Sequence, residues 1–279
     1  MAKREKGFLG LIPLLLFFSI FLFFPFASLL TSSIQDNDGN FTLALYGNLF
    51  HGEYAAAFLE SIKLGFASML ISGFAGGVIC WSLSKATNST RTLVNTVSGL
   101  LANTGGVPLA FMFIAAFGQE GLVVRALMKI FHYDLYSGSF ELFNFWGLVA
   151  VYCFFQIPLM LIIFMPTVEH IRAEWYEANV TLGGNTLKYL LHIIIPIVGP
   201  AFLSSLFLLF GNAFSAFATA EAMTNGTIPL IPLLIGNLVN GEVISGQANQ
   251  GAALAMGMIF FSFFLFLFFP LLTKKLAKA

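Results

Sequence analysis

The chain alternates long apolar runs with shorter polar segments. The apolar runs cover about residues 8–34, 59–83, 94–118, 144–168, 190–222 and 251–273. A helix needs roughly 20 consecutive apolar residues to cross a bilayer, and each run is about that long or longer. The polar segments between them are 35–58, 84–93, 119–143, 169–189 and 224–250. This pattern predicts an all-α integral membrane protein with six transmembrane helices.

Composition supports this interpretation and excludes a soluble domain. Apolar residues make up 58% of the chain, whereas charged residues make up only 9%. A soluble domain carries about 25% charged residues. Phenylalanine alone occurs 34 times.

The basic residues predict how the chain is oriented in the membrane. Ten of the thirteen Lys and Arg residues fall on one side of the six runs: Lys3, Arg4, Lys6, Lys85, Arg91, Arg172, Lys188, Lys274, Lys275 and Lys278. By the positive-inside rule that side is cytoplasmic. We therefore expect a cytoplasmic N-terminus (1–7), one six-helix transmembrane domain (8–273) whose loop 169–189 is cytoplasmic, and a basic cytoplasmic C-terminus (274–279).

The six runs differ in character. The first and last are rich in Phe around their circumference, which suits contact with lipid. The second to fifth contain glycines that let helix backbones approach closely. Those glycines are Gly73, Gly76, Gly77, Gly105, Gly106 and Gly211. The second to fifth runs are therefore expected to form an inner bundle.

Several polar side chains lie inside the apolar runs, where an unpaired polar group is costly. They are Asn103, Gln156, Asn212, Ser215, Thr219 and Glu221. One hypothesis is hydrogen bonding between helices, and the other is that some of them line a translocation path. Ser215 and Thr219 are four residues apart, so they share a face if the helix is continuous. A kink is expected after Asn103, at Gly105-Gly106-Val107-Pro108.

The segment 169–189 combines charged and aromatic residues outside the apolar runs. Residues 169–182 predict a short amphipathic helix that lies off the bilayer core. Gly183-Gly184-Asn185 should end it, because glycine accepts positive φ. A second helix is expected from near Thr186 into the fifth run. An ordinary interfacial loop is the alternative interpretation.

The same segment resembles the "EAA" coupling loop of bacterial ABC importer permeases. That pattern has Glu-Ala-Ala, then Leu-Gly five and six residues after the Glu, then Leu/Ile-Pro about a dozen residues later. The matching residues are Glu177, Ala178, Leu182, Gly183, Ile195 and Pro196. Asn179 replaces the second Ala, and Gly184-Asn185 replaces the usual Ala-Ser. Residues 108–122, 227–235 and 251–255 resemble, more weakly, the corresponding regions of permeases in the iron(III), polyamine, thiamine and sulfate group.

This resemblance implies the permease subunit of a type I ABC importer in a bacterial cytoplasmic membrane. Such a subunit works with a second permease, identical or related, with two cytoplasmic ATPases and with an external solute-binding protein, by alternating access. The implied ATPase-coupling residues are Glu174, Glu177, Ala178, Leu182, Gly183, Gly184 and Pro196. The chain has no G-x-x-x-x-G-K-[ST] loop, so we expect no enzymatic activity and no cofactor here, with ATP and magnesium on the partner ATPase.

Two other function classes would leave different patterns in the sequence. A gradient-driven secondary transporter or channel would predict inverted repeats and several buried ionisable residues. A membrane-embedded enzyme would need paired carboxylates, a Ser/His set or a metal cluster. Neither pattern is visible, the four histidines have no metal-ligand spacing, and no nucleic-acid signature occurs. The substrate stays open among polyamines, thiamine, iron(III) and oxyanions or phosphonates.

Overall fold

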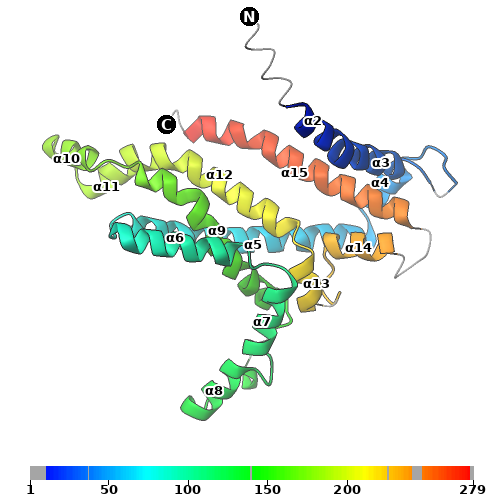
Figure 1. Ribbon diagram of the computed structural model, residues 1–279, viewed down its shortest axis with the longest axis horizontal. Helices are drawn as coiled ribbons and strands as arrows, with labels where there is room; N and C mark the ends of the chain where they lie inside the picture. Colours follow the sequence, from blue (N-terminus) through cyan, green and yellow to red (C-terminus); the bar gives the residue numbers. More distant parts are fainter. Residues whose placement is uncertain (1–10, 37, 139, 225, 241–246, 277–279) are drawn as a thin grey trace, which may run out of the picture. The chain divides into compact units, whose positions relative to one another are not determined.

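The structure is a computed structural model, and the regular elements in its described part are helices joined by turns and loops (Figure 1). It describes residues 11–276 except 37, 139, 225 and 241–246, with side chains as far as residue 267. Within these residues no strand forms, and Gln35 and Phe41 make an isolated bridge. The expected N-terminal segment 1–7 lies outside the described residues, as does the end of the basic C-terminus.

Six helices are long and apolar enough to cross a membrane. They are Ile12–Ser33, Gly52–Leu83, Val107–Phe131, Phe145–Glu169, Thr186–Phe214 and Ala248–Leu267. A short helix, α10 (Ala173–Thr181), lies between the fourth and the fifth of them. The predicted fold class, an all-α membrane protein with six spans and a helix between spans four and five, is confirmed.

Several of these spans are composite. The first consists of α2 (Ile12–Phe18), a π-helical turn η1 (Ser19–Phe23) and α3 (Phe24–Ser33). The third consists of α7 (Val107–Phe117) and α8 (Leu122–Phe131), and the fifth of α11 (Thr186–Tyr189), a π-helical turn η3 (Leu190–Ile194) and α12 (Ile195–Phe214). The other long helices are α5 (Gly52–Leu83), α6 (Asn88–Ala102), α9 (Phe145–Glu169) and α15 (Ala248–Leu276).

The chain divides into two compact units. The first comprises residues 1–57 and 234–261, and the second comprises 58–233 and 262–279. In the first unit, Gln250 near the start of α15 accepts a hydrogen bond from Asn48 of α4 (Ala44–Asn48) at 3.0 Å and donates one to the carbonyl of Leu45 at 3.2 Å. Asn249 donates to the carbonyl of Asp36 at 2.9 Å. Side-chain amides therefore tie the segment after the first span to α15.

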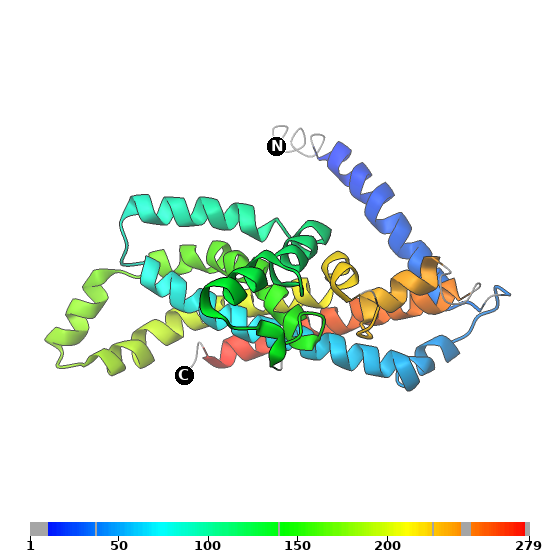
Figure 2. The ribbon, with the colours of Figure 1, turned by 90° about the horizontal axis from the view of Figure 1, so that it is seen from below.

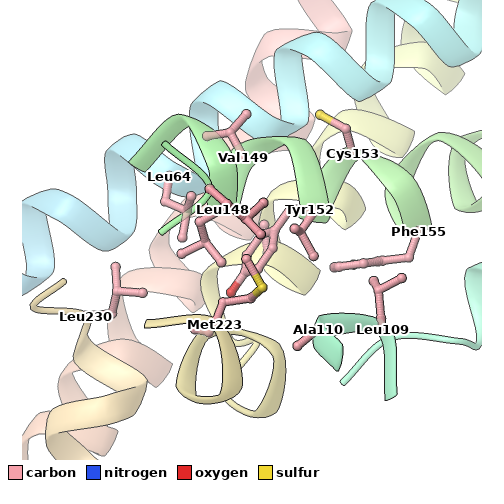
Figure 3. Packing of buried hydrophobic residues seen from close by; sticks show 14 of the residues in the cluster. Leu64, Leu109, Ala110, Leu148, Val149, Tyr152, Cys153, Phe155, Met223 and Leu230 are labelled. Atoms are coloured by element: carbon pink, nitrogen blue, oxygen red, sulfur yellow. The ribbon is translucent and has the colours of Figure 1, made fainter. Parts of the chain in front are cut away.

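Helix α9 forms the centre of the second unit. Two thirds of its apolar window (67%) is buried, a larger share than for any other candidate span. Helices α6 and α12 pack against it. Figure 3 shows Leu148 and Tyr152 of α9 near Leu64 of α5 and Met223 of α13 (Ala218–Thr224), and Phe155 of α9 beside Leu109 of α7. The apolar core of this unit is therefore built around one helix, as the strong hydropathy of residues 145–169 favours.

Three glycines of α5 permit close packing on α9 and α12, as predicted. A Cβ atom built on Gly76 would lie 2.7 Å from Met160 Cβ, and one on Gly73 would lie 2.1 Å from Leu206 Cδ2. Gly77 similarly faces the ring of Phe202. Gly105 and Gly211 have nothing within 4 Å of a built Cβ. The expectation of close packing was therefore wrong for these two glycines.

The predicted third span, 94–118, is not one helix. Helix α6 ends at Ala102, and α7 begins only at Val107 after Gly106, whose φ is +86°. Gly106 leaves the helical conformation, and Pro108 lies in the first turn of α7, where its missing N–H group needs no partner, so a new helix starts at this point. The expected kink is a complete break. The third membrane-length stretch therefore starts at Val107 and runs to Phe131. It includes α8, which lies in the segment 119–143 that was predicted to be a polar connection.

The predicted fifth span, 190–222, also ends earlier than expected. Helix α12 stops at Phe214, and α13 begins at Ala218. The hydroxyl of Ser215 bonds back to the carbonyl of Gly211 at 2.8 Å. Bonds of this kind compete with the helical backbone pattern and accompany bends. Two helices therefore replace the one that was predicted.

We predict that Gly76→Ala destabilises the second unit. The new methyl group would meet Met160 at its Cβ, an atom fixed to the backbone that cannot rotate away. Overpacking of this kind costs about 1–3 kcal/mol. Thermal unfolding of the purified chain in detergent should therefore start at a lower temperature. The matched control is Gly99→Ala, on α6, where a Cβ meets nothing within 4 Å. Equal melting of the two variants would contradict the prediction.

Candidate functional site

Helix α10 stands apart from the core and leaves its apolar side chains uncovered. Arg172 precedes it in an extended conformation (φ −89°, ψ 139°), and Glu174 lies in its first turn, where an acidic side chain is favoured. No residue of the helix is buried. Val180 is 51% exposed, and Leu182, just after the last turn, is 87% exposed. The chain itself leaves about half of Val180 and most of Leu182 exposed.

The helix ends in a tight corner at Gly183, which the sequence predicts. The N–H of Gly183 bonds to the carbonyl of Val180 at 2.9 Å, and the N–H of Gly184 bonds to the carbonyl of Asn179 at 2.8 Å. Gly183 has φ +75°. These two bonds and the left-handed residue form a Schellman motif, which satisfies the carbonyls at the end of a helix. The corner is therefore held by its own backbone and presents Leu182 at its tip.

Asn179 and Gly184-Asn185, the residues that depart from the coupling-loop pattern, contact each other. Asn179 Nδ2 donates a hydrogen bond to the carbonyl of Asn185 at 3.2 Å, across the corner. A Cβ on Gly184 would lie 2.1 Å from Asn179 Oδ1, so the amide of Asn179 occupies the space of a side chain at 184. Asn185 in turn caps the next helix, because its Oδ1 accepts from the N–H of Lys188 at 2.9 Å. A side chain at 184 would therefore require the amide of Asn179 to move.

The corner connects directly to a long membrane-length helix. The continuous helix Thr186–Phe214 begins two residues after Gly184, as predicted. Tyr176 of α10 packs edge-on against Tyr189 of α11, with ring centroids 5.2 Å apart, and Tyr189 is only 7% exposed. Figures 1 and 2 show the α10–α11 hairpin projecting beyond α9 and α12. This aromatic contact was missed from sequence, because Tyr176 and Tyr189 are brought together only by the corner.

Pro196 follows the π-helical turn η3. A proline ring crowds the carbonyl four residues earlier and cannot donate a hydrogen bond to it. Here that carbonyl belongs to His192, within η3, and the N–H of Ile195 bonds to the carbonyl of Leu190 five residues back. A widened turn of this kind accommodates the proline without ending the helix.

The six polar residues predicted within the spans have different surroundings. Gln156 is fully buried: its Nε2 lies 3.4 Å from the carbonyl of Leu209, and its Oε1 has no hydrogen-bond partner. Thr219 is buried, and its hydroxyl accepts from the N–H of Gly106 at 2.8 Å. Asn103, Asn212 and Ser215 are exposed, and Glu221 is half-buried with one carboxylate oxygen that is buried and unpartnered.

The predicted common face of Ser215 and Thr219 does not form, because the helix ends between them. Thr219 instead contacts Gly106 in the break between α6 and α7, a segment that starts at Asn103. A second bond closes the break between α12 and α13: the hydroxyl of Tyr152 donates to the carbonyl of Ala216 at 3.0 Å. Sequence reasoning missed Tyr152, since a tyrosine in an apolar run gives no signal of its partner. Within the described residues, no group of three or more His, Cys, Asp or Glu side chains is placed to hold a metal ion.

Curated relatives of the chain are transport permeases. It is 27% identical over 247 residues to a probable permease for starch degradation products from Thermoanaerobacterium thermosulfurigenes, covering 81% of each chain. It is 22% identical to the spermidine/putrescine permease PotC of Haemophilus influenzae, covering 91% of this chain and 93% of that one. A probable sulfate permease of Helicosporidium is 23% identical, over just under two thirds (66%) of each chain. No protein-family model matches the chain.

Solved structures show the same fold. A chain of a bacterial ABC transporter involved in import of the acidic polysaccharide alginate superimposes with a TM-score of 0.78 at 16% identity, over 98% of this chain and 96% of that one. The same kind of transporter in complex with an alginate-pentasaccharide-bound periplasmic protein gives a TM-score of 0.76 at 15% identity, over 100% and 97% of the two chains. The chain is a homologue of ABC importer permeases. It is accordingly a multi-pass membrane protein of the transport class.

In this permease homologue, the residues predicted to couple to an ATPase and the polar residues of the spans lie in the same compact unit. Glu177, Leu182 and Gly183 belong to the hairpin, whereas Gln156 and Thr219 lie in the helical bundle around α9. Helix Thr186–Phe214 runs between the two regions, since it begins at the hairpin and passes Leu209, the contact of Gln156.

We predict that Thr219→Val destabilises the permease homologue. The variant keeps the shape of the side chain but leaves the N–H of Gly106 without its partner. An unsatisfied buried donor costs about 1–3 kcal/mol. Thermal unfolding in detergent should therefore shift to lower temperature. Thr92→Val is the control, because the hydroxyl of Thr92 is exposed and bonds only to the carbonyl of Asn88 in its own helix. The idea fails if both variants melt like the wild type.

Proposed function

We propose that this chain is the permease subunit of an ABC importer that receives a cytoplasmic ATPase at the α10–Gly183 corner. The observation that carries this proposal is the 87% exposed Leu182 at the tip of a locally fixed corner, which leads directly into a helix of 29 residues. A hydrophobic side chain so exposed on a projecting hairpin suits insertion into a groove of a partner.

The hairpin offers a contact surface of mixed character. Apolar or aromatic side chains at its centre are exposed: Tyr176 by 43%, Val180 by 51% and Leu187 by 63%. Glu174 and Glu177 are exposed on the same helix and add negative charge to this surface. An apolar centre with a polar rim is the usual anatomy of a protein interface. Ala178, Gly184 and Pro196 would shape the hairpin, and none of these residues acts as an acid or base.

Motion of the partner would pass into the membrane through the connection to α12. The Tyr176–Tyr189 contact and the short corner couple α10 to α11. In the proposed mechanism, ATP and magnesium bind the ATPases, which draw the hairpins of two permease subunits together and open the path outward. Hydrolysis returns the pair to the inward-facing state. The basic residues favour a cytoplasmic hairpin and cytoplasmic termini.

The proposed translocation path takes a small polar or charged solute. Asn103, Asn212 and Ser215 are exposed neutral hydrogen-bonding groups and are the first candidates to face it. Gln156, Thr219 and Glu221 are more enclosed in the described state. The named relatives transport an anion, polycations and sugars. Neutral amides and hydroxyls can hydrogen-bond to all three classes of solute, so we assign selectivity to an external solute-binding protein. The substrates to try are sulfate-like oxyanions, polyamines, thiamine and iron(III).

We predict that Leu182→Ala weakens retention of the ATPase about tenfold or more. A side chain that fills a desolvated pocket at the centre of an interface is worth over 1 kcal/mol, and often more than 2. Its loss should leave folding unchanged, because Leu182 contacts little of its own chain. Co-purification in mild detergent with the neighbouring gene products measures this. Glu177→Lys should act in the same direction.

The matched control is Leu122→Ala on α8, where the leucine is 78% exposed and far from the hairpin in sequence. It should retain the ATPase like the wild type. Should no ATPase associate even with the wild type, a gradient-driven transporter becomes the better explanation, with Glu221 as its ionisable group.

We also predict that Gly183→Ala lowers solute-dependent ATPase activity several-fold. A side chain at φ +75° costs about 1–2 kcal/mol, so the corner relaxes and Leu182 shifts. Gly39→Ala is the control, since Gly39 has φ +82° and equally open surroundings but lies outside the hairpin. Both variants carry the same backbone strain. An equal loss of activity in the two would show that the corner has no special role.

A further inference from the structure

A cavity of about 620 Å³ lies at the root of the α10–α11 hairpin and belongs wholly to the second unit. It is bounded by the end of α5, the first turn of α6, the end of α9 and the start of α10 and α11. Three membrane-length helices therefore end or begin around it, at Leu83, Glu169 and Thr186. This places the cavity at the surface of the bilayer rather than at its centre.

The cavity carries an excess of positive charge. Lys85, Arg91 and Arg172 line it, against the single carboxylate of Glu169. Neither of the two ion pairs in the described part of the chain, Lys63–Glu60 and Arg125–Glu120, involves these residues. Three cations without a carboxylate partner within ion-pair distance create a site for an anion.

One of these cations is held in place before any ligand arrives. Arg91 Nε donates to the carbonyl of Leu83 at 2.9 Å, and its Nη2 donates to the carbonyl of Ser84. These bonds cap the end of α5 and use two of the five N–H groups of the guanidinium. The remaining N–H groups stay available, and phosphate matches their planar geometry.

The rest of the lining suits a lipid rather than a free ion. Trp81 lies in the wall with the ammonium of Lys85 5.6 Å from its ring centroid, and Trp together with Lys or Arg is typical of the membrane interface. Val168, Ile171 and Leu190 add an apolar wall. An inorganic phosphate would leave this wall uncovered, whereas the glycerol and upper acyl chains of a phospholipid would cover it.

We propose that this cavity binds the headgroup phosphate of an anionic phospholipid. Lys85 and Arg172 approach the phosphate from the α5–α6 connection and from the start of α10, and Arg91 offers its free N–H groups between them. The bound lipid would link the end of α5 to the root of the hairpin. Tyr176 lines this cavity and also belongs to the hairpin surface, whereas Leu182 does not line the cavity, so substitutions at Lys85 and Arg172 test the lipid site without altering Leu182.

Native mass spectrometry of the full transporter complex in detergent tests the proposal, with added phosphatidylglycerol and phosphatidylcholine as probes. The test variant is the pair Lys85→Gln and Arg172→Gln. The control pair is Arg125→Gln and Lys129→Gln, which removes the same charge from α8. Arg91 is left intact because it caps α5, and the elution volume and melting temperature of each variant check its folding.

We expect the wild type and the control to retain phosphatidylglycerol in preference to phosphatidylcholine. The test variant should bind phosphatidylglycerol roughly 25-fold more weakly, at roughly fivefold for each charge removed. Unchanged phosphatidylglycerol retention in a folded test variant would overturn the site. Displacement of the lipid by millimolar inorganic phosphate in the wild type would show that the ligand is a soluble anion and would overturn the lipid assignment. Loss of lipid without loss of ATPase would separate this site from the coupling contact.

Discussion

Backbone hydrogen bonding in an apolar medium is the constraint on which this structure depends. A helix satisfies its own N–H and C=O groups, so it can cross a bilayer, but each break in a helix frees groups that must find other partners. The second unit meets this requirement with side chains brought from distant parts of the sequence. Thr219 accepts from the N–H of Gly106 where α7 begins, and Tyr152 donates to the carbonyl of Ala216 beyond the end of α12.

The same device recurs at other helix ends. Arg91 donates to the carbonyls that close α5, Ser61 accepts from the N–H of Ile231 at the start of α14 (Ile231–Asn240), and Tyr136 donates to the carbonyl of Phe117 at the end of α7. Each bond joins two segments that are far apart or separated by a turn. The irregular points of the chain are therefore also the points where the unit is cross-linked, and helix breaks do not loosen it.

The sequence was informative where a signal was local. Apolar runs predicted six spans, and Gly183-Gly184-Asn185 predicted the corner and the helix that follows it, because glycine conformation and asparagine capping act within a few residues. The breaks at Gly106 and after Phe214 were underestimated, since apolar residues continue on both sides and hydropathy does not register a free backbone group. Long-range partners such as Thr219 with Gly106 could not be read from spacing. For the same reason Ser215 and Thr219 were wrongly placed on one face.

The hairpin combines such local and distant constraints. Its corner is fixed by backbone bonds within six residues, so it moves as one piece. Its helix α10 has no buried residue, so little resists its displacement apart from the Tyr176–Tyr189 contact and the chain itself. The hairpin joins α9 at its start and α12 at its end, and on the α12 side the connection passes through η3, where a widened turn precedes Pro196. A turn that lacks regular helical bonding is the most easily deformed part of the helix Thr186–Phe214, and its position between the hairpin and the bundle is where a hinge would convert movement of a partner into movement of the span.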